Sequence, residues 1–261
     1  MVVRDLAHGR TTAIARRGGA YEPAVSGDGR KVAFTAFRSG RLAVFVRDLA
    51  TRRTVLAGRI PDAAGGAGAG GLPLEAWEPS LSQDGSRVAF TATPRAGARS
   101  RVYVRELAQP RAVAVSGRDA GHAAEPSLSS DGRRVAYSEQ PAHAKPSASG
   151  RPGQRVIVRI LGAGAGAGAV RVATSDADGR ELGGWSGQPQ LSGGGRSIAF
   201  TTDAHTPPDG GPGGLQVLVR DLAARTTTVA NPPAPLGSFD TGAGALQSGD
   251  EPLCRLAPPA W

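Results

Sequence analysis

Hydrophobic and β-branched residues recur along this chain in short runs, and clusters of Gly, Pro, Asp and Ser separate the runs. The segments Val32-Ala33-Phe34-Thr35 and Val44-Phe45-Val46 are typical. Runs of this length between turn residues predict β-strands. No long window keeps a helical period, because Pro and Gly interrupt every one of them. The pattern therefore predicts an all-β protein.

The runs belong to a repeat that occurs four times. Each copy has a proline, a glycine six residues later and an aromatic residue eleven residues later. The prolines are Pro23, Pro79, Pro126 and Pro189, and the aromatic residues are Phe34, Phe90, Tyr137 and Phe200. Asp-Gly pairs lie between the two runs at Asp28-Gly29, Asp84-Gly85 and Asp131-Gly132, whereas the fourth copy has Gly193-Gly194-Gly195. A tight hairpin turn is expected at each position, because Gly supplies the positive φ that such a turn requires.

Each copy continues with a third and a fourth predicted strand. The third carries an arginine after a Val-rich run, at Arg47, Arg105, Arg159 and Arg220. The fourth is a short β-branched run, at 54–57, 112–115, 170–173 and 226–230. Four antiparallel strands per copy are what a propeller blade needs, whereas a β-sandwich, the structural alternative, would not impose the fixed spacing. We expect an all-β propeller with complete blades at about 22–57, 78–116, 125–174 and 188–230.

Both ends of the chain carry part of a further copy. Residues 2–15 match the third and fourth strands, and residues 251–256 begin another first strand. The second strand is missing from this pair, and an open array leaves edge strands unpaired. We expect one propeller domain over 1–261 that is incomplete: a segment of a longer propeller of six or more blades, or an interrupted coding sequence, and marginally stable alone.

The blade pattern Glu-Pro-x-Leu-Ser-x-Asp-Gly-Arg-x-Val-Ala-Phe, followed by Val-x-Val-Arg-Asp-Leu, resembles the TolB-like (WD40-like) propeller repeat of bacterial proteins. This resemblance covers residues 2–253 and implies a non-catalytic scaffold that binds a protein or peptide partner. It equally leaves open the detached substrate-gating propeller of a prolyl-oligopeptidase-like serine hydrolase. Relatives are commonly periplasmic or extracellular, yet the chain starts without a signal-peptide pattern, so the resemblance leaves localisation undecided.

In a propeller the first strand of each blade lines the central channel, and the variable loops between the second and third strands suggest where ligands bind. The candidate residues precede each proline or lie close to it: Glu22, Glu78, Glu125, Gln188, Tyr21, Trp77 and Trp185, with Glu251 in the last partial copy. Two interpretations are open. The residues form an acidic, aromatic-edged mouth for a cationic peptide. Alternatively, each glutamate caps backbone amides or pairs with a neighbouring Arg, and the aromatic residues wedge between blades. Repeated residues usually serve repeated packing, which favours the second.

Composition removes several other functions. The chain has 31 Lys and Arg against 22 Asp and Glu, a net charge of +9, but the basic residues are scattered. We therefore expect no nucleic-acid partner. The single Cys excludes an internal disulfide, and no apolar run is long enough for a membrane-spanning helix. The four His residues lie far apart and no nucleophile motif is present. We expect no enzyme activity, no cofactor and no metal site.

Overall fold

In the computed structural model the placed residues are 1–15, 19–60, 75–117, 120–141, 144, 146–147, 150–162, 167–176, 178–204 and 215–230. They all lie in one unit, Met1–Asn231. This described part contains strands and no helix. The all-β class predicted from the sequence is confirmed. The first strand expected at 251–256 lies outside the described residues.

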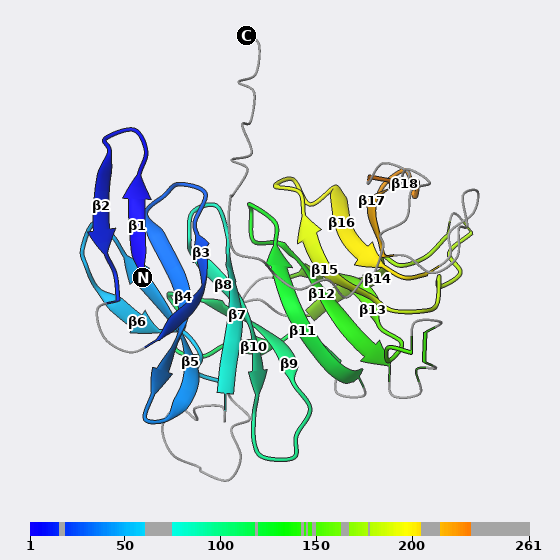
Figure 1. The fold of residues 1–261 in the computed structure, drawn as a ribbon, viewed down its shortest axis with the longest axis horizontal. Coiled ribbons are helices and arrows are strands. Elements are labelled where there is room, and N and C mark those ends of the chain that lie inside the picture. Colours follow the sequence, from blue (N-terminus) through cyan, green and yellow to red (C-terminus); the bar gives the residue numbers. More distant parts are fainter. Residues whose placement is uncertain are drawn as a thin grey trace, which may run out of the picture. The chain divides into compact units, whose positions relative to one another are not determined.

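The strands form one two-stranded sheet and four four-stranded sheets (Figure 1). The N-terminal hairpin pairs β1 (Val2–Asp5) with β2 (Arg10–Ala13). The first four-stranded sheet contains β3 (Ala20–Val25), β4 (Lys31–Arg38), β5 (Arg41–Asp48) and β6 (Thr54–Leu56). The second contains β7 (Glu75–Leu81), β8 (Arg87–Thr93), β9 (Arg101–Glu106) and β10 (Val113–Ala114).

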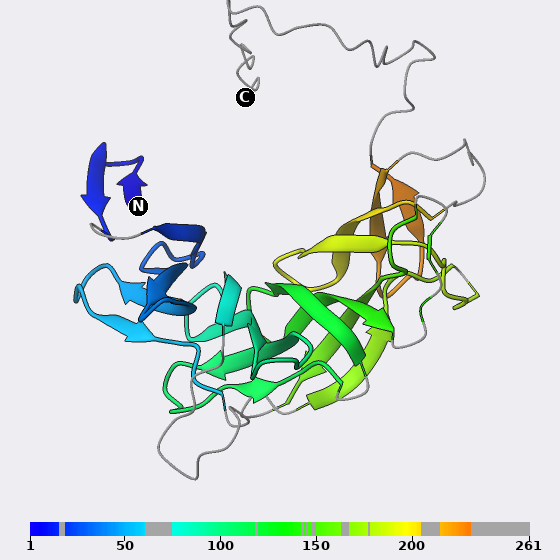
Figure 2. The same ribbon diagram turned by 60° about the horizontal axis from the view of Figure 1, so that its bottom comes forward.

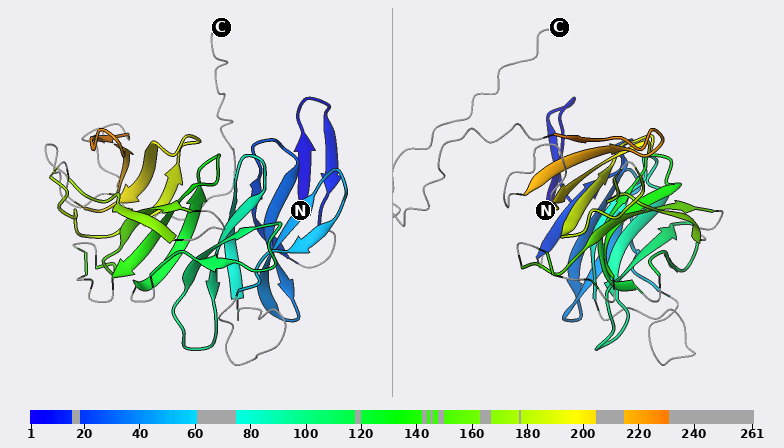
Figure 3. Two further views of the ribbon diagram at one scale, coloured as in Figure 1. Left: turned by 180° about the vertical axis from the view of Figure 1, so that it is seen from behind. Right: turned by 90° about the vertical axis from the view of Figure 1, so that its right-hand side faces the viewer.

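The third sheet contains β11 (Ala120–Leu128), β12 (Arg134–Pro141), β13 (Arg155–Leu161) and β14 (Ala167–Val172). The fourth contains β15 (Ser186–Leu191), β16 (Ser197–Thr202), β17 (Gln216–Asp221) and β18 (Thr227–Val229). Within each sheet the strands follow one another in chain order, as the colours of Figures 2 and 3 show. Neighbouring strands pair antiparallel. The predicted fold class, a β-propeller of four-stranded antiparallel blades with a partial blade before the first, is confirmed.

Each sheet has two ends, which we name by the connections that they carry. We call the end with the tight turns between its first and second strands the turn end; these turns are Ser26–Arg30, Ser82–Ser86, Ser129–Arg133 and Ser192–Arg196. The opposite end, which carries the β4–β5 hairpin at Ser39-Gly40 and the β8–β9 connection at 94–100, is the loop end.

A serine and an aspartate build the tight turn. In the first sheet the Ser26 hydroxyl donates to Asp28 Oδ1 at 2.6 Å, and the Arg30 amide donates to the same oxygen at 3.0 Å. Gly29 has a φ of 69°, which a residue without a Cβ adopts freely. The second and third sheets repeat these bonds with Asp84 and Asp131.

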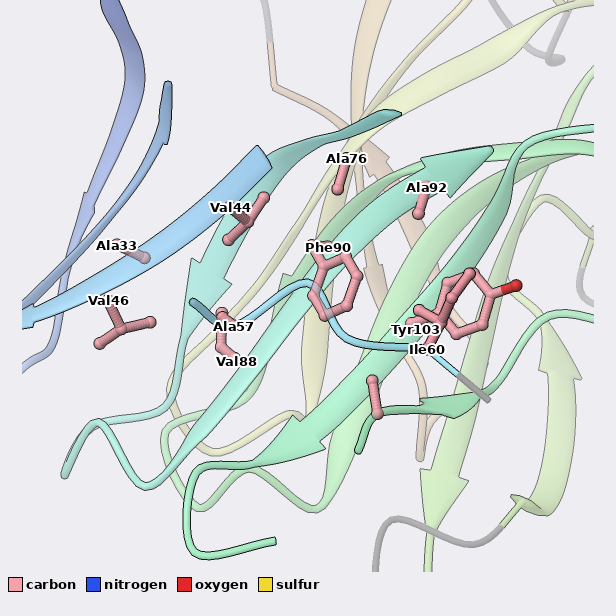
Figure 4. Close-up of a cluster of buried hydrophobic side chains, with 11 residues drawn as sticks. Ala33, Val44, Val46, Ala57, Ile60, Ala76, Val88, Phe90, Ala92 and Tyr103 are labelled. Carbon is pink, nitrogen blue, oxygen red and sulfur yellow. The ribbon is translucent and has the colours of Figure 1, made fainter. Parts of the chain in front are cut away.

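The hydrophobic core lies between successive sheets. In one cluster Val44 and Ala57 of the first sheet pack with Val88, Phe90 and Tyr103 of the second, all fully buried (Figure 4). The rings of Phe90 and Tyr103 stack with their centroids 5.9 Å apart. Similar clusters join the second sheet to the third and the third to the fourth. Alternation along each strand places the apolar side chains of both sheets in these shared layers.

Candidate functional site

The glutamates of the repeat lie inside the first strand of each sheet, at a β-bulge. Between Tyr21 and Ala24 of β3 the pairing with β4 shifts register by one residue, and β7, β11 and β15 shift at the same point. The bulged residues Glu22, Glu78, Glu125 and Gln188 have φ values of 51°, 54°, 58° and 53°. Non-glycine residues rarely adopt this left-handed conformation. The same strained residue therefore recurs in all four sheets, which indicates a shared structural use.

That use is a hydrogen bond to the next sheet. Glu22 Oε2 accepts from the Glu78 amide at 2.8 Å, and Glu78 Oε2 accepts from the Glu125 amide at 2.8 Å. Glu125 Oε2 then accepts from the Gln188 amide at 2.8 Å. Each side chain thus satisfies a backbone donor on the neighbouring first strand. The four candidate residues form one continuous row across four sheets.

In three of the sheets the strand beside the bulge supplies a hydroxyl donor to the bulged side chain. The hydroxyl of Thr35 donates to Glu22 Oε2 and that of Thr91 to Glu78 Oε2, both at 2.8 Å. Thr201 donates to Gln188 Oε1 at 3.2 Å. In the third sheet Ser138 donates instead to the Ala124 carbonyl at 3.1 Å, so the repeat is not uniform there.

Burial and neighbouring charge act together on Glu78. Its pKa is raised above the ordinary value of 4.5, first because burial disfavours the charged carboxylate. The carboxylates of Glu125 and Glu22 raise the pKa further, while the bonds from the Glu125 amide and Thr91 lower it. The row therefore brings three carboxyl groups together along the first strands, and their oxygens cap amides, as the structural interpretation expects.

The candidate aromatic residues lie in different surroundings. Tyr21 is 49% exposed and packs edge to face on Phe37, with ring centroids 6.2 Å apart. Trp77 is half-buried on β7. Trp185 is half-buried under the Arg151 guanidinium, which lies 4.7 Å from the ring centroid. Trp185 and Glu125 approach the same residue, because a Cβ at Gly187 would lie 2.9 Å from Trp185 Cζ2 and 3.0 Å from Glu125 Oε2.

Two features at the loop end were not predicted from the sequence. Phe37 is 55% exposed at the loop end of β4, and Arg151 covers Trp185. An aromatic residue three positions after Phe34 occurs only in the first copy of the repeat, and this departure was the available signal. Nothing local in the sequence indicates Arg151.

At the turn end, basic side chains connect the sheets. Lys31 Nζ donates to the Gly85 carbonyl at 3.1 Å, and Arg87 Nη1 donates to the Gly132 carbonyl at 2.9 Å. Two of the recurring third-strand arginines also bond beyond their own sheet. Arg105 is buried and donates to the carbonyls of Leu56 and Ala57 at 2.7 and 3.2 Å, and Arg220 donates to the carbonyls of Ser175 and Asp176. These contacts give the two arginines a structural role.

Among the placed residues no three His, Cys, Asp or Glu side chains are grouped to hold a metal ion. No helix long and apolar enough to cross a membrane occurs in the described ranges.

Comparison with known proteins supports the fold. No protein-family model matches the sequence, and no curated protein matches it. TolB from Acinetobacter baumannii is similar in structure, with a TM-score of 0.55 and 18% identity over 88% of this chain and 48% of that one. A TolB-assigned protein from Agrobacterium tumefaciens has a TM-score of 0.58 and 13% identity over 88% of this chain and 69% of that one.

A prolyl endopeptidase structure is also similar, with a TM-score of 0.50 and 16% identity over 81% of this chain and 29% of that one. The chain therefore spans about half of the first TolB structure, 48%, and a smaller part of the peptidase. At these identities the likeness concerns the fold. The structural likeness to the two TolB proteins shows that this chain has a TolB-like propeller fold.

Proposed function

We propose that the protein is a non-catalytic propeller scaffold that binds a protein or peptide partner through the loop ends of its sheets. The observation that carries this proposal is the Tyr21–Phe37 pair, whose two aromatic rings are about half exposed. Aromatic side chains exposed together favour a protein interface, because they bury much apolar area at low entropic cost.

A hollow at the loop end of the first sheet supports the same location. Phe37 pairs with Leu42 at the end of the β4–β5 hairpin, and Arg38 pairs with Arg41. Arg38, Arg41, Leu42 and Ala76 line a cavity of about 320 Å³. A cavity of this size accommodates one or two side chains of an extended segment.

The glutamate row supplies the preference for charge. Glu22 is exposed, whereas Glu78 and Glu125 are half-buried, so the row retains a solvent-accessible anionic end near Tyr21. A partner segment that carries Lys or Arg next to an aromatic or aliphatic residue would complement both features.

Selection of peptides from a random displayed library by the full chain tests this proposal. The selected peptides should be enriched in basic and apolar residues. The double variant Tyr21→Ser/Phe37→Ser should lose their binding. Val25→Ser, which removes a 53% exposed residue from the turn end of the same strand, is the matched control and should retain it. Equal binding by the double variant and the wild type would refute the loop-end site.

The second candidate function is a detached gating propeller of a prolyl-oligopeptidase-like serine hydrolase. The likeness to a prolyl endopeptidase over 81% of this chain favours it. A fluorophosphonate labels the active serine of such hydrolases. If a partner that binds at the loop ends reacts with it, this alternative is supported. A partner that does not react would support the scaffold.

A further inference from the structure

A basic groove lies at the turn ends of the third and fourth sheets. Its volume is about 660 Å³, within the range of small-molecule sites. Four arginines line it, Arg134, Arg171, Arg196 and Arg225, together with the aliphatic Ile160 and Leu222. No Asp or Glu of the described residues lines this groove.

The strand pairing shows that one expected acid is missing. Lys31 lies opposite Asp48, and Arg87 lies opposite Glu106, to which it forms an ion pair of 2.5 Å. At the same position of the third sheet Arg134 lies opposite Ile160. The cation is retained in this copy of the repeat and its carboxylate is not.

A second acid is missing from the adjoining turn. The first three sheets have an aspartate in the turn, whereas the fourth has Gly194. The corresponding groove between the second and third sheets shows the difference, because Glu106 and Asp131 line it beside Arg87 and Arg133. Lys31 also lines that groove, so two carboxylates there offset most of the charge of three cations.

A third departure adds a cation to the same place. Arg171 of β14 lies opposite Val158. At this position the other sheets have uncharged residues, Val55, Val113 and Thr228. Three separate changes in the repeat, two lost acids and one gained arginine, therefore converge on one groove.

The arginines keep donors available for a ligand. Arg134 Nη1 donates to the Gly194 carbonyl and Arg171 Nη1 to the Leu222 carbonyl, both at 3.0 Å. Arg196 Nε pairs with Asp221 at 3.0 Å. Arg134, Arg171 and Arg225 form no ion pair with any described residue. Each guanidinium has five N–H donors, of which these contacts use few.

We propose that this groove binds a small organic anion that carries two or more phosphate or carboxylate groups. The planar guanidinium matches both oxyanions with paired hydrogen bonds. Ile160 and Leu222 supply an apolar wall for the body of the molecule. This site is at the opposite end of the sheets from the proposed partner site and does not depend on it.

Isothermal titration of the full chain with inorganic pyrophosphate and, separately, with citrate tests the proposal at about 0.15 M salt, where nonspecific attraction between exposed charges is screened. We expect one-site binding of at least one probe. Two substitutions restore the residue type of the other sheets: Arg171→Val and Gly194→Asp. Each should weaken binding about tenfold, since each changes one charge-assisted contact.

Both variants suit the local structure. Valine occupies the position of Arg171 in two other sheets, and a Cβ at Gly194 would meet no atom within 4 Å. Arg52→Gln is the matched control. Arg52 occupies in the first sheet the position that Arg225 occupies in the fourth, with φ values of 57° and 59°. Circular dichroism shows whether each variant folds.

Binding of pyrophosphate alone would identify a phosphate site, and binding of citrate alone would identify a carboxylate site. Either result supports the proposal when Arg171→Val weakens it and Arg52→Gln does not. Absence of binding to both probes overturns it. Equal weakening by Arg171→Val and Arg52→Gln also overturns it, because the net charge would then account for the attraction.

Discussion

Glu78 shows how one side chain satisfies several demands of the repeat. Its carboxylate accepts from the Glu125 amide and from Thr91, both at 2.8 Å, and is half-buried between two other glutamates. Both hydrogen bonds use Oε2. A proton on Oε1 would leave that acceptor in place, so protonation relieves the desolvation and repulsion of the charge without breaking the link between sheets.

The pH dependence of the free energy of unfolding should reveal this protonation of Glu78. Because the folded-state pKa of Glu78 is raised above 4.5, the folded protein holds the proton more tightly than the unfolded chain does. Glu78 therefore contributes stability below pH 4.5, and this contribution is lost as pH rises through the folded-state pKa. Relative to wild type, Glu78→Gln should become more stable as pH rises over this window, measured by urea unfolding at several pH values.

Glu75→Gln is the control for that measurement, since it removes an exposed carboxylate from the same strand, β7. If both substitutions change the pH profile of the unfolding free energy to the same extent, the effect does not come from the buried carboxylate.

The tight turn recurs in all four sheets, and in three of them an aspartate completes it. In the second sheet Asp84 Oδ1 accepts from the Ser82 hydroxyl at 2.8 Å and from the Ser86 amide at 2.9 Å. These bonds lower the pKa of Asp84, first through the Ser86 amide. In the fourth sheet Ser192 still accepts from the Ser197 amide at 3.0 Å, but Gly194 has no carboxylate to complete the turn.

Exchanging the two residues should change stability in opposite directions. Asp84→Gly should lower the free energy of unfolding by about 1 kcal/mol, because two hydrogen bonds are lost and the unfolded chain gains freedom. Gly194→Asp should raise it by a similar amount for the reverse reasons. Denaturant unfolding at neutral pH measures both. Because the folded-state pKa of Asp84 lies below its ordinary 3.8, its contribution is present above pH 3.8 and is lost as pH falls further.

The third-strand arginine differs between sheets although its position does not. Arg105 is 8% exposed and donates to the Leu56, Ala57 and Gln109 carbonyls. Arg105→Gln should lower the free energy of unfolding by about 1–3 kcal/mol, because buried carbonyls lose their donors. Arg47→Gln should change it by less than about 0.5 kcal/mol, because Arg47 bonds only to Thr54 among the described residues. Similar losses in both variants would contradict this.

The strands and turns could be predicted because their signals are local. Both faces of β8 are buried, and alternation decides which core layer a residue enters: Phe90 lies in one cluster and Ala89 in the next. Asp28-Gly29 determines its own turn within five residues. The bond from Glu22 to the Glu78 amide joins residues 56 positions apart and depends on how one sheet lies on the next. The sequence indicates that the repeated glutamates cap backbone amides, but not which amide each carboxylate accepts from. It also shows Ile160, Gly194 and Arg171 as separate departures, which only the pairing of strands brings into one groove.

At the scale of the whole molecule the core is a series of shared layers. The cluster around Phe90 includes Val44 and Ala57 from the first sheet and Val88 from the second (Figure 4). The Glu22 carboxylate, the Lys31 ammonium and the Arg105 guanidinium connect the same two sheets. Neither sheet can bury its apolar face without the other, so the stability of neighbouring sheets should be coupled.

Hydrogen exchange tests this coupling directly. Phe90→Ala removes a fully buried ring and should lower the free energy of unfolding by about 3–5 kcal/mol. Because the cavity opens in a layer that both sheets line, amide protection measured by mass spectrometry should fall in β4–β5 as well as in β8–β9. Phe200→Ala, in the layer between the third and fourth sheets, should reduce protection in β12–β13 and β16–β17 and affect β4–β5 least. Loss of protection confined to β7–β10 in Phe90→Ala would show that each sheet opens alone, and that the shared layers do not couple them.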